Sequence, residues 1–224
     1  MDDLTRIGIE MGTDKAFYHT FTSFYEPYFR QFRYAPITIL EIGICEGASL
    51  QMLAKYFPNA QIHGIDVNPK SVRNYGERIH TYLCSQIDKN RLAQLFENMK
   101  FDIIIDDGSH VTSHQQTTLG LLFEQLNPKG LYVCEDIHTS LSPNSVDTRL
   151  NTIDFLKSAT FESECIPPIT QKSISSNVSR VDFYKRTTMP YKCWNCKQPF
   201  QMCSCGKDIR PSETDSQTAV LVRV

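Results

Sequence analysis

The feature that most constrains the fold of this chain is an alternation of short apolar runs with amphipathic stretches. Residues 37–44 form a β-branched run (ITILEIGI), and residues 101–105 form a nearly continuous apolar run (FDIII). Runs of this kind are typical of strands that are buried on both faces of a parallel sheet. Residues 47–57 and 112–126 are predicted to be helices, because their apolar side chains recur at helical spacing. The alternation therefore predicts an α/β fold with a doubly wound, mostly parallel sheet and right-handed crossovers.

Further elements complete the alternation. Strands are also predicted at residues 61–67, 80–84 and 131–134, and helices at residues 88–99 and 146–158. The alternation fades after residue 161, where residues 161–166 and 178–185 are predicted to form a closing antiparallel pair. Residues 218–224 (TAVLVRV) are too apolar for a loose terminus, which favours an edge strand or an oligomer contact.

Length and composition limit the classes of protein that the chain can be. With 224 residues, of which 41% are apolar, it is long enough for one domain with an appendage. No apolar run approaches the roughly 18 residues of a membrane span, and the acidic start, Met1-Asp2-Asp3-Leu4, is not a secretory signal. We therefore expect a cytoplasmic protein with no membrane partner. A formal net charge of −2 argues against nucleic acid as the main partner.

A glycine-containing turn follows the first predicted strand. Gly43 and Gly47 lie where a ligand can approach the backbone and where a helix N-terminus favours negative groups. Their G-x-x-x-G spacing differs from the G-x-G-x-x-G of dinucleotide-binding folds, so a purely structural turn explains it equally well. Asp66 ends the second strand about twenty residues later, where a carboxylate in such folds receives a ribose diol. A cap at Asn68 is the alternative role of Asp66.

Acidic residues follow the next two strands of the sheet. The strand at residues 101–105 ends in Asp106-Asp107-Gly108-Ser109-His110, and the strand at residues 131–134 ends in Glu135-Asp136. Neighbouring parallel strands end at the same crevice, so Asp107, Glu135 and Asp136 are expected to converge there. Three carboxylates with no basic residue nearby suit a hard divalent cation such as Mg²⁺, although a solvated acidic rim is the alternative. His110 titrates near neutral pH and is the candidate general base.

The cysteines fall into two groups. Four are scattered among apolar runs and are predicted to be small buried hydrophobes: Cys45, Cys84, Cys134 and Cys165. The other four are crowded as C-x-x-C followed by C-x-C: Cys193, Cys196, Cys203 and Cys205. Four thiolates at this spacing predict a structural zinc site, and the alternative is a cysteine-rich tail with free thiols.

Several of these motifs together resemble one family. The segments LEIGICEGASLQML, IHGIDVNP, FDIIIDDGSH and GLYVCEDIHTS resemble those of class I S-adenosylmethionine (AdoMet) methyltransferases. The sequence is more closely similar to the metal-dependent sugar O-methyltransferases of macrolide biosynthesis and the related cephalosporin-hydroxylase-like group. Upstream, Gly12-Thr13-Asp14-Lys15, His19 and Phe24-Tyr25-Glu26 also match that group. Nothing in the family pattern accounts for the cysteine cluster.

The resemblance implies a role for each matching residue. It implies that the Mg²⁺ ligands are Asp107, Glu135 and Asp136 and that the catalytic base is His110. It implies that AdoMet is contacted by Thr13, Glu41, Gly43, Asp66, Ser85, Gln86 and Asp106. Within this set, Gly43 would face the methionine part and Asp66 the ribose. Ser85 stands where the adenine-binding loop of the family usually carries an acid, whereas Gln86 is retained.

The resemblance covers about residues 10–165 and suggests a division of the chain. Residues 1–36 are expected to be an N-terminal segment that closes over the cofactor, and residues 37–190 an AdoMet-binding, Rossmann-like domain. Residues 191–210 are the expected small zinc-binding module, and residues 211–224 a loop with an edge strand.

The function that these observations favour is a Mg²⁺-dependent AdoMet O-methyltransferase acting on a hydroxyl of a small diol, such as a sugar or polyphenol. A macromolecular acceptor docked through the zinc module is an alternative, although the near-neutral charge argues against a large nucleic-acid footprint. A third hypothesis, from another class, is a binding protein that keeps the fold without turnover. Whether the chain forms a homo-oligomer is left open by the sequence.

Overall fold

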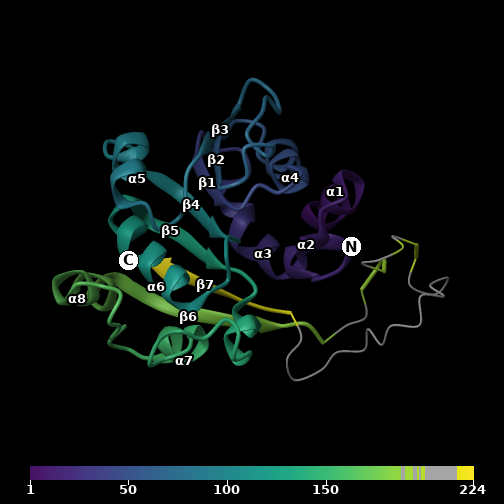
Figure 1. The fold of residues 1–224 in the computed structure, drawn as a ribbon. Helices are drawn as coiled ribbons and strands as arrows, with labels where there is room; N and C mark the ends of the chain where they lie inside the picture. The colour runs from purple at the N-terminus through teal and green to yellow at the C-terminus, as the bar shows by residue number, and fades with distance from the viewer. Residues whose placement is uncertain (188–189, 194–195, 197, 200–215) are drawn as a thin grey trace.

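The computed structural model describes residues 1–187, 190–193, 196, 198–199 and 216–224. The described residues form one seven-stranded sheet in the order β3-β2-β1-β4-β5-β7-β6 (Figure 1). The strands are β1 (Thr38–Ile42), β2 (Gln61–Asp66), β3 (Ile79–Leu83), β4 (Phe101–Asp106), β5 (Leu126–Cys134), β6 (Val178–Lys185) and β7 (Gln217–Arg223). Strands β1 to β5 pair in parallel, whereas β7 is antiparallel to both β5 and β6. The predicted α/β fold is confirmed.

Helices cover both faces of the sheet. The α-helices are α1 (Asp3–Met11), α2 (Asp14–Phe17), α3 (Phe21–Phe29), α4 (Ala48–Tyr56), α5 (Lys89–Phe96), α6 (Thr112–Leu122), α7 (Thr152–Lys157) and α8 (Pro168–Asn177). Three short 3₁₀ segments are η1 (Arg30–Phe32), η2 (Phe123–Gln125) and η3 (Ile137–Leu141). Helices α1, α3 and α4 pack on one face, and α5 to α8 pack on the other. Among the described residues, no helix has both the length and the apolar character that a membrane crossing requires.

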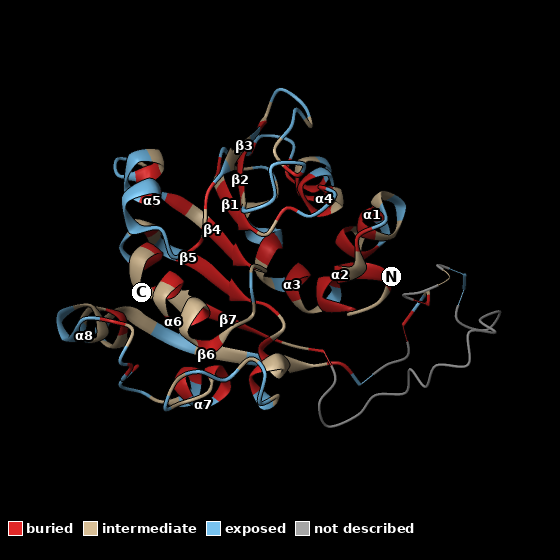
Figure 2. Cartoon of the chain, viewed as in Figure 1, coloured by how far each residue is buried: buried red, intermediate tan, exposed pale blue. Residues whose placement is uncertain are grey.

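The central strands are apolar on both sides because both sides are covered. In β4, Ile103 and Ile105 pack with α3 and α4, whereas Ile104, which points the other way, packs with α5 and α6. All three side chains are almost fully buried, and the central strands of the sheet are buried along most of their length (Figure 2). Burial on two faces explains why FDIII shows no polar alternation.

The strand register brings the ends of β1, β4 and β5 to one level. Ile42 of β1 pairs with Asp106 of β4, which pairs in turn with Cys134 of β5. The next residues continue the ladder, because the Asp107 amide donates to the Ile42 carbonyl and the Glu135 amide donates to the Asp106 carbonyl. The loops that follow these three strands therefore meet at the edge where the strand order reverses, which is where α/β sheets place their ligands.

The C-terminal half departs from the predicted elements. Residues 161–166 are not a strand, because Phe161 and Ile166 pack into the core beneath α6 and α7. The partner of β6 is β7, and β7 lies between β5 and β6 rather than at the sheet edge. Interior placement explains its apolar sequence better than an edge does, because side chains on both faces are covered.

Several element boundaries also differ. Residues 127–130, which separate the predicted helix at 112–126 from the predicted strand at 131–134, lie inside β5, where the pairing with β4 is irregular and a proline is tolerated. The predicted helix at residues 146–158 is reduced to α7. The predicted helix at residues 88–99 is α5, which is capped by Asp88 and ends at Phe96. The helix α8 was not predicted, and its low amphipathic contrast explains why: only Ile174 is fully buried.

Candidate active site

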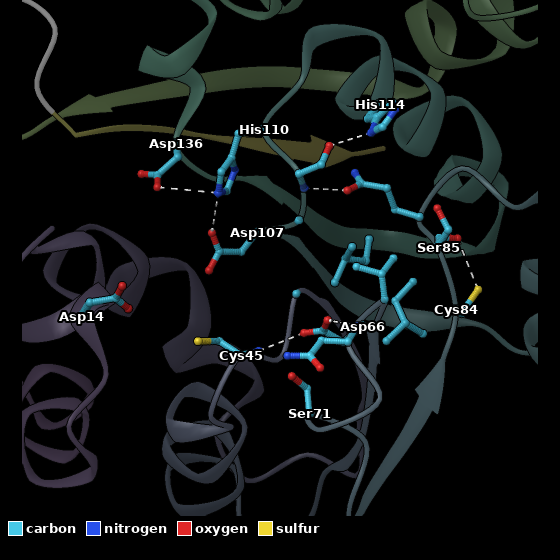
Figure 3. A pocket seen from close by; sticks show the side chains of 18 of the residues that line it. Asp14, Cys45, Asp66, Ser71, Cys84, Ser85, Asp107, His110, His114 and Asp136 are labelled. Carbon is cyan, nitrogen blue, oxygen red and sulfur yellow. Dashed lines mark hydrogen bonds and ion pairs between the residues drawn. The ribbon is translucent and has the colours of Figure 1, made fainter. Parts of the chain in front are cut away.

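A cavity of about 800 Å³ opens at the level of the strand ends (Figure 3). Seven of the residues that the sequence suggested for the site line it: Gly43, Asp66, Ser85, Gln86, Asp107, His110 and Asp136. Four others are buried behind its wall and expose 2% of their surface or less: Thr13, Glu41, Asp106 and Glu135. A cavity of this size is typical of small-molecule sites. The strand ends therefore bring most of the candidate residues together, from loops far apart in the sequence.

Gly43 allows the loops after β1 and β4 to touch. Its φ angle is +88°, and a Cβ at this position would lie 2.0 Å from the backbone oxygen of Asp107. Only glycine permits both this conformation and this approach. The backbone therefore requires glycine at position 43 whether or not a ligand is bound.

Asp66 closes the same turn from the end of β2. Its Oδ2 accepts hydrogen bonds from the amides of Ile44 (2.9 Å) and Cys45 (3.0 Å), and its Oδ1 accepts one from the Asn68 amide (2.8 Å). The capping role at Asn68 is therefore present in the structure. Each carboxylate oxygen has a further lone pair, and Asp66 also lines the cavity, so capping does not prevent contact with a ligand.

Asp106 and Gln86 form a buried hydrogen-bond network beneath the cavity. Asp106 accepts from the Tyr132 hydroxyl at 3.1 Å and from Gln86 Nε2 at 3.2 Å. The Gln86 Oε1 in turn accepts from the Ser109 amide at 2.7 Å, which holds the loop after β4 in place. Burial raises the pKa of Asp106 to about 7. Both side chains are thus engaged within the protein and shape the wall of the cavity from behind.

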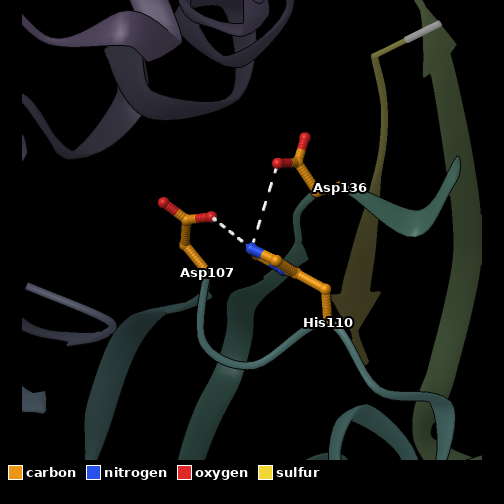
Figure 4. A group of neighbouring side chains, drawn as sticks. All are labelled: Asp107, His110 and Asp136. Atoms are coloured by element: carbon orange, nitrogen blue, oxygen red, sulfur yellow. Dashed lines mark ion pairs between the residues drawn. The ribbon is translucent and has the colours of Figure 1, made fainter. Parts of the chain in front are cut away.

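Asp107, His110 and Asp136 converge in the cavity (Figure 4). His110 Nε2 lies 3.9 Å from Asp107 Oδ1 and 4.0 Å from Asp136 Oδ2. One ligand atom from each of the three side chains lies within 4.8 Å of the other two. Burial lowers the pKa of His110, so the imidazole is neutral near pH 7 and its ring can accept a proton or bind a cation.

A basic residue, Lys15 of α2, lies inside the acidic group. Its Nζ contacts Asp107 Oδ2, lies 2.9 Å from Glu135 Oε2 and lies 3.5 Å from Glu41 Oε1. Burial alone would lower the pKa of Lys15, but the surrounding carboxylates outweigh it and hold this pKa well above its ordinary value. The prediction that the carboxylates have no basic residue nearby is therefore wrong. The lysine comes from a helix distant in sequence, and its only local signal was the Gly12-Thr13-Asp14-Lys15 motif.

One ammonium does not balance the acidic group. Burial raises the pKa of Glu41 to about 7 and that of Asp136 to about 8, and it raises the pKa of Glu135 well above its ordinary value. Among the described residues, Glu135 Oε1 and Asp136 Oδ1 are buried without a hydrogen-bond partner. Buried carboxyl oxygens without partners are costly and are the kind of group that a bound cation satisfies, and a cation would also return these carboxyls to their charged form.

Further histidines surround Asp136. His19 Nδ1 lies 3.6 Å and His138 Nδ1 lies 3.7 Å from Asp136 Oδ1. Burial lowers the pKa of His19 to about 4, so this ring is neutral at physiological pH. The sequence suggested no role for either ring, because both come close to Asp136 only when η3 and the segment after α2 fold against the strand ends.

The three loops share an uncommon backbone conformation. Cys45, His110 and Asp136 follow β1, β4 and β5, and they have φ angles of +50°, +58° and +50°. Residues other than glycine rarely adopt positive φ, and such positions cluster at functional sites. In this conformation the side chains of His110 and Asp136 point toward each other in the cavity (Figure 4).

The cysteines divide less simply than predicted. Cys84 and Cys134 are buried and Cys165 is partly buried, but Cys45 is exposed and lines the cavity, so the prediction of a buried Cys45 is wrong. Its place at the tip of the turn after β1 turns the thiol away from the core (Figure 3). Cys203 and Cys205 lie outside the described residues. Cys193 is 1% exposed, and its amide donates to the Gln198 carbonyl at 3.0 Å.

The known proteins with similar sequences include methyltransferases. Residues 40–137 match a methyltransferase domain family. The chain is 38% identical over 167 residues to 8-demethyl-8-alpha-L-rhamnosyl tetracenomycin-C 2'-O-methyltransferase of Streptomyces olivaceus, covering 69% of this chain and 44% of that relative. It is 38% identical over 151 residues to mycinamicin VI 2''-O-methyltransferase of Micromonospora griseorubida, covering 63% of this chain and 37% of that relative.

Solved structures point in the same direction. The MycE methyltransferase from the mycinamycin biosynthetic pathway, in complex with Mg, SAH and mycinamycin VI, superposes with a TM-score of 0.69 at 26% identity. The match covers 99% of this chain and 54% of that chain. This chain therefore spans about half, or less, of the length of these relatives.

The parallel sheet, its reversal point and the matched family define the class. Residues 40–137 are a methyltransferase domain, and the fold is that of the class I AdoMet-dependent methyltransferases, as the sequence motifs predicted. Within that class it is similar to the tetracenomycin and mycinamicin O-methyltransferases.

Proposed function

We propose that this chain is the catalytic domain of an AdoMet-dependent and Mg²⁺-dependent O-methyltransferase that acts on a hydroxyl of a sugar-like diol. The observation that carries the proposal is the convergence of Asp107, Asp136 and His110 in one cavity with the turn at Gly43 and Asp66. The names of the relatives, which are methyltransferases of sugars on polyketides, support the acceptor class.

The residues at the strand ends fit a hard divalent cation. Asp107, Glu135 and Asp136 would hold it, since carboxylate oxygens are the ligands that Mg²⁺ prefers. Glu135 Oε1 and Asp136 Oδ1 are buried without hydrogen-bond partners among the described residues, which is the deficit that a cation would remove. When bound, AdoMet supplies a methyl group activated by its sulfonium, and Mg²⁺ supplies a Lewis acid that lowers the pKa of a hydroxyl.

The proposed base is His110. Burial keeps the ring neutral near pH 7, and its Nε2 faces the cavity between two carboxylates. A neutral imidazole can take the proton of the acceptor hydroxyl, and the carboxylates then stabilise the imidazolium. The roles of Gly43, Asp66, Ser85 and the buried residues around Gln86 are to shape and line the cofactor side of the cavity.

Methyl transfer from radiolabelled AdoMet to a panel of L-rhamnosyl and other sugar glycosides tests the proposal. We expect turnover with Mg²⁺, loss of turnover with EDTA, and a loss of about 10²- to 10⁴-fold in His110→Asn. His80→Asn is the matched control, because His80 is exposed on β3. Turnover that survives both EDTA and His110→Asn would show the mechanism to be wrong, and binding of AdoMet without transfer to any acceptor would favour a non-catalytic protein.

A structural zinc ion on Cys193, Cys196, Cys203 and Cys205 is a second part of the proposal. It is supported by the C-x-x-C and C-x-C spacing and by the Cys193 amide bond to Gln198, which closes a turn around Cys196. The turn is braced by an antiparallel bridge between Lys192 and Pro199. Elemental analysis should give about one zinc per chain, lost in Cys193→Ser, and a zinc-free protein would exclude the site.

A further inference from the structure

Lys15 is a buried cation that the proposed mechanism does not use. Its side chain is 3% exposed, and it reaches the strand ends from α2. Its Nζ contacts Asp107 and Glu135, and it lies 3.5 Å from Glu41. Burying a lysine is costly unless it is paired. Its position among two proposed Mg²⁺ ligands therefore requires an explanation.

Each of the two carboxylates contacts Lys15 through one oxygen only. Asp107 gives Oδ2 to Lys15, while its Oδ1 lies 3.9 Å from His110 Nε2. Glu135 gives Oε2 to Lys15 at 2.9 Å, while its Oε1 has no hydrogen-bond partner among the described residues. Each of the two carboxylates thus has one oxygen that Lys15 does not occupy.

We propose that Lys15 is a positioning residue that shares Asp107 and Glu135 with the divalent cation. It holds the two carboxylates in place when no cation is bound, and by its charge it weakens the binding of the cation. The inference rests on the proposed function, since it concerns the same metal site. It also assigns a purpose to α2, which brings an internal counter-charge to a site otherwise built from strand ends.

Two effects of Lys15 on cation binding oppose each other. Removing a residue that orients metal ligands typically weakens binding by about 10- to 100-fold. Removing a positive charge that shares a carboxylate with the cation strengthens binding, because like charges repel strongly at a buried site where water screens little. Lys15 is buried and contacts the ligands directly, so we expect the loss of repulsion to dominate.

The test is a titration of Mn²⁺, read by the electron paramagnetic resonance of the free ion, with thermal unfolding measured in parallel. The variants are Lys15→Met, which removes the charge, and Lys15→Gln, which removes the charge but keeps a hydrogen-bond donor. Lys55→Met is the matched control, because Lys55 pairs with Glu10 on the surface and is far from the strand ends. The readouts need neither AdoMet nor an acceptor.

We expect both variants to bind Mn²⁺ at least about tenfold more tightly than the wild type, with Lys55→Met unchanged. Without metal, both should unfold at a temperature lower by about 10 °C, and Mn²⁺ should restore most of the loss. If a variant does not fold without metal, it should fold when saturating Mn²⁺ is added.

Equal or weaker binding of Mn²⁺ by folded Lys15→Met and Lys15→Gln overturns the inference, as does failure of both to fold at saturating Mn²⁺. In those cases Lys15 is an ordinary buried ion pair or acts only by orienting its partners. A wild-type protein that binds no Mn²⁺ at the strand ends overturns the metal site itself. The failure of the inference and the failure of the proposed function are therefore distinguishable.

Discussion

Replacing Gly43 by alanine tests how closely the loops after β1 and β4 must approach. Two costs apply at this position. The φ angle of +88° is unfavourable for alanine by roughly 1–2 kcal/mol. The new methyl carbon would also lie 2.0 Å from the Asp107 carbonyl oxygen, and relieving such an overlap costs about 1–3 kcal/mol. We therefore expect Gly43→Ala to lower the free energy of unfolding by about 2–5 kcal/mol.

Gly12 provides a matched control within the same protein. Its φ angle of +78° is similar, but a Cβ there would have no heavy atom within 4 Å. Gly12→Ala should therefore lower the free energy of unfolding only by the conformational cost of roughly 1–2 kcal/mol. The difference between the two variants isolates the contact with Asp107.

Urea unfolding at constant pH, followed by circular dichroism, measures both variants. Because the overlap pushes on the residue that bears the Asp107 side chain, Gly43→Ala should also weaken Mn²⁺ binding, whereas Gly12→Ala should not. Equal free energies of unfolding for the two variants would refute the reasoning, since the loops would then separate without cost.

Two further predictions concern the buried network around Asp106. Tyr132→Phe removes the hydroxyl that donates to Asp106 at 3.1 Å, so the free energy of unfolding should fall by about 1–3 kcal/mol in urea titrations, and an unchanged midpoint would contradict this. Burial raises the pKa of Asp106 to about 7, above its usual value in the unfolded chain, so its contribution to stability should be full below about pH 4 and should be lost as the pH rises toward 7. Urea midpoints of the metal-free protein at pH 5 and pH 7.5 measure this loss, which should be smaller in Asp106→Asn, and an equal pH dependence in that variant would point to other groups.

The sequence predicted what local pattern determines. The apolar run that contains Ile103, Ile104 and Ile105 correctly predicted a strand buried on two faces. The acidic residues after it correctly predicted that this strand ends at the cavity. The family motifs then identified the class. These inferences held because each rests on consecutive residues whose chemistry is set by one element.

What the sequence missed depends on contacts between distant segments. Lys15 meets Asp107 across 92 positions of the chain, and no periodicity reports such a pairing. The position of β7 between β5 and β6 could not be predicted either. An apolar strand has the same sequence pattern whether it lies in the interior of a sheet or at a covered edge. The exposure of Cys45 was also missed. Cys45 has a positive φ angle, and the neighbouring glycines do not indicate this from the sequence.

The pairing of β6 with β7 has a consequence for how this domain can diversify. Lys185 and Gln217 are opposite each other in the ladder, so the intervening chain leaves and re-enters the sheet at adjacent points. Lengthening a loop anchored in this way costs only about 0.6 kcal/mol for each doubling of its length. Ser216, at the point of re-entry, bonds to His19 at 2.7 Å beside Asp136. A connection of different length can therefore be accommodated at this junction without any change to the pairing of β6 with β7.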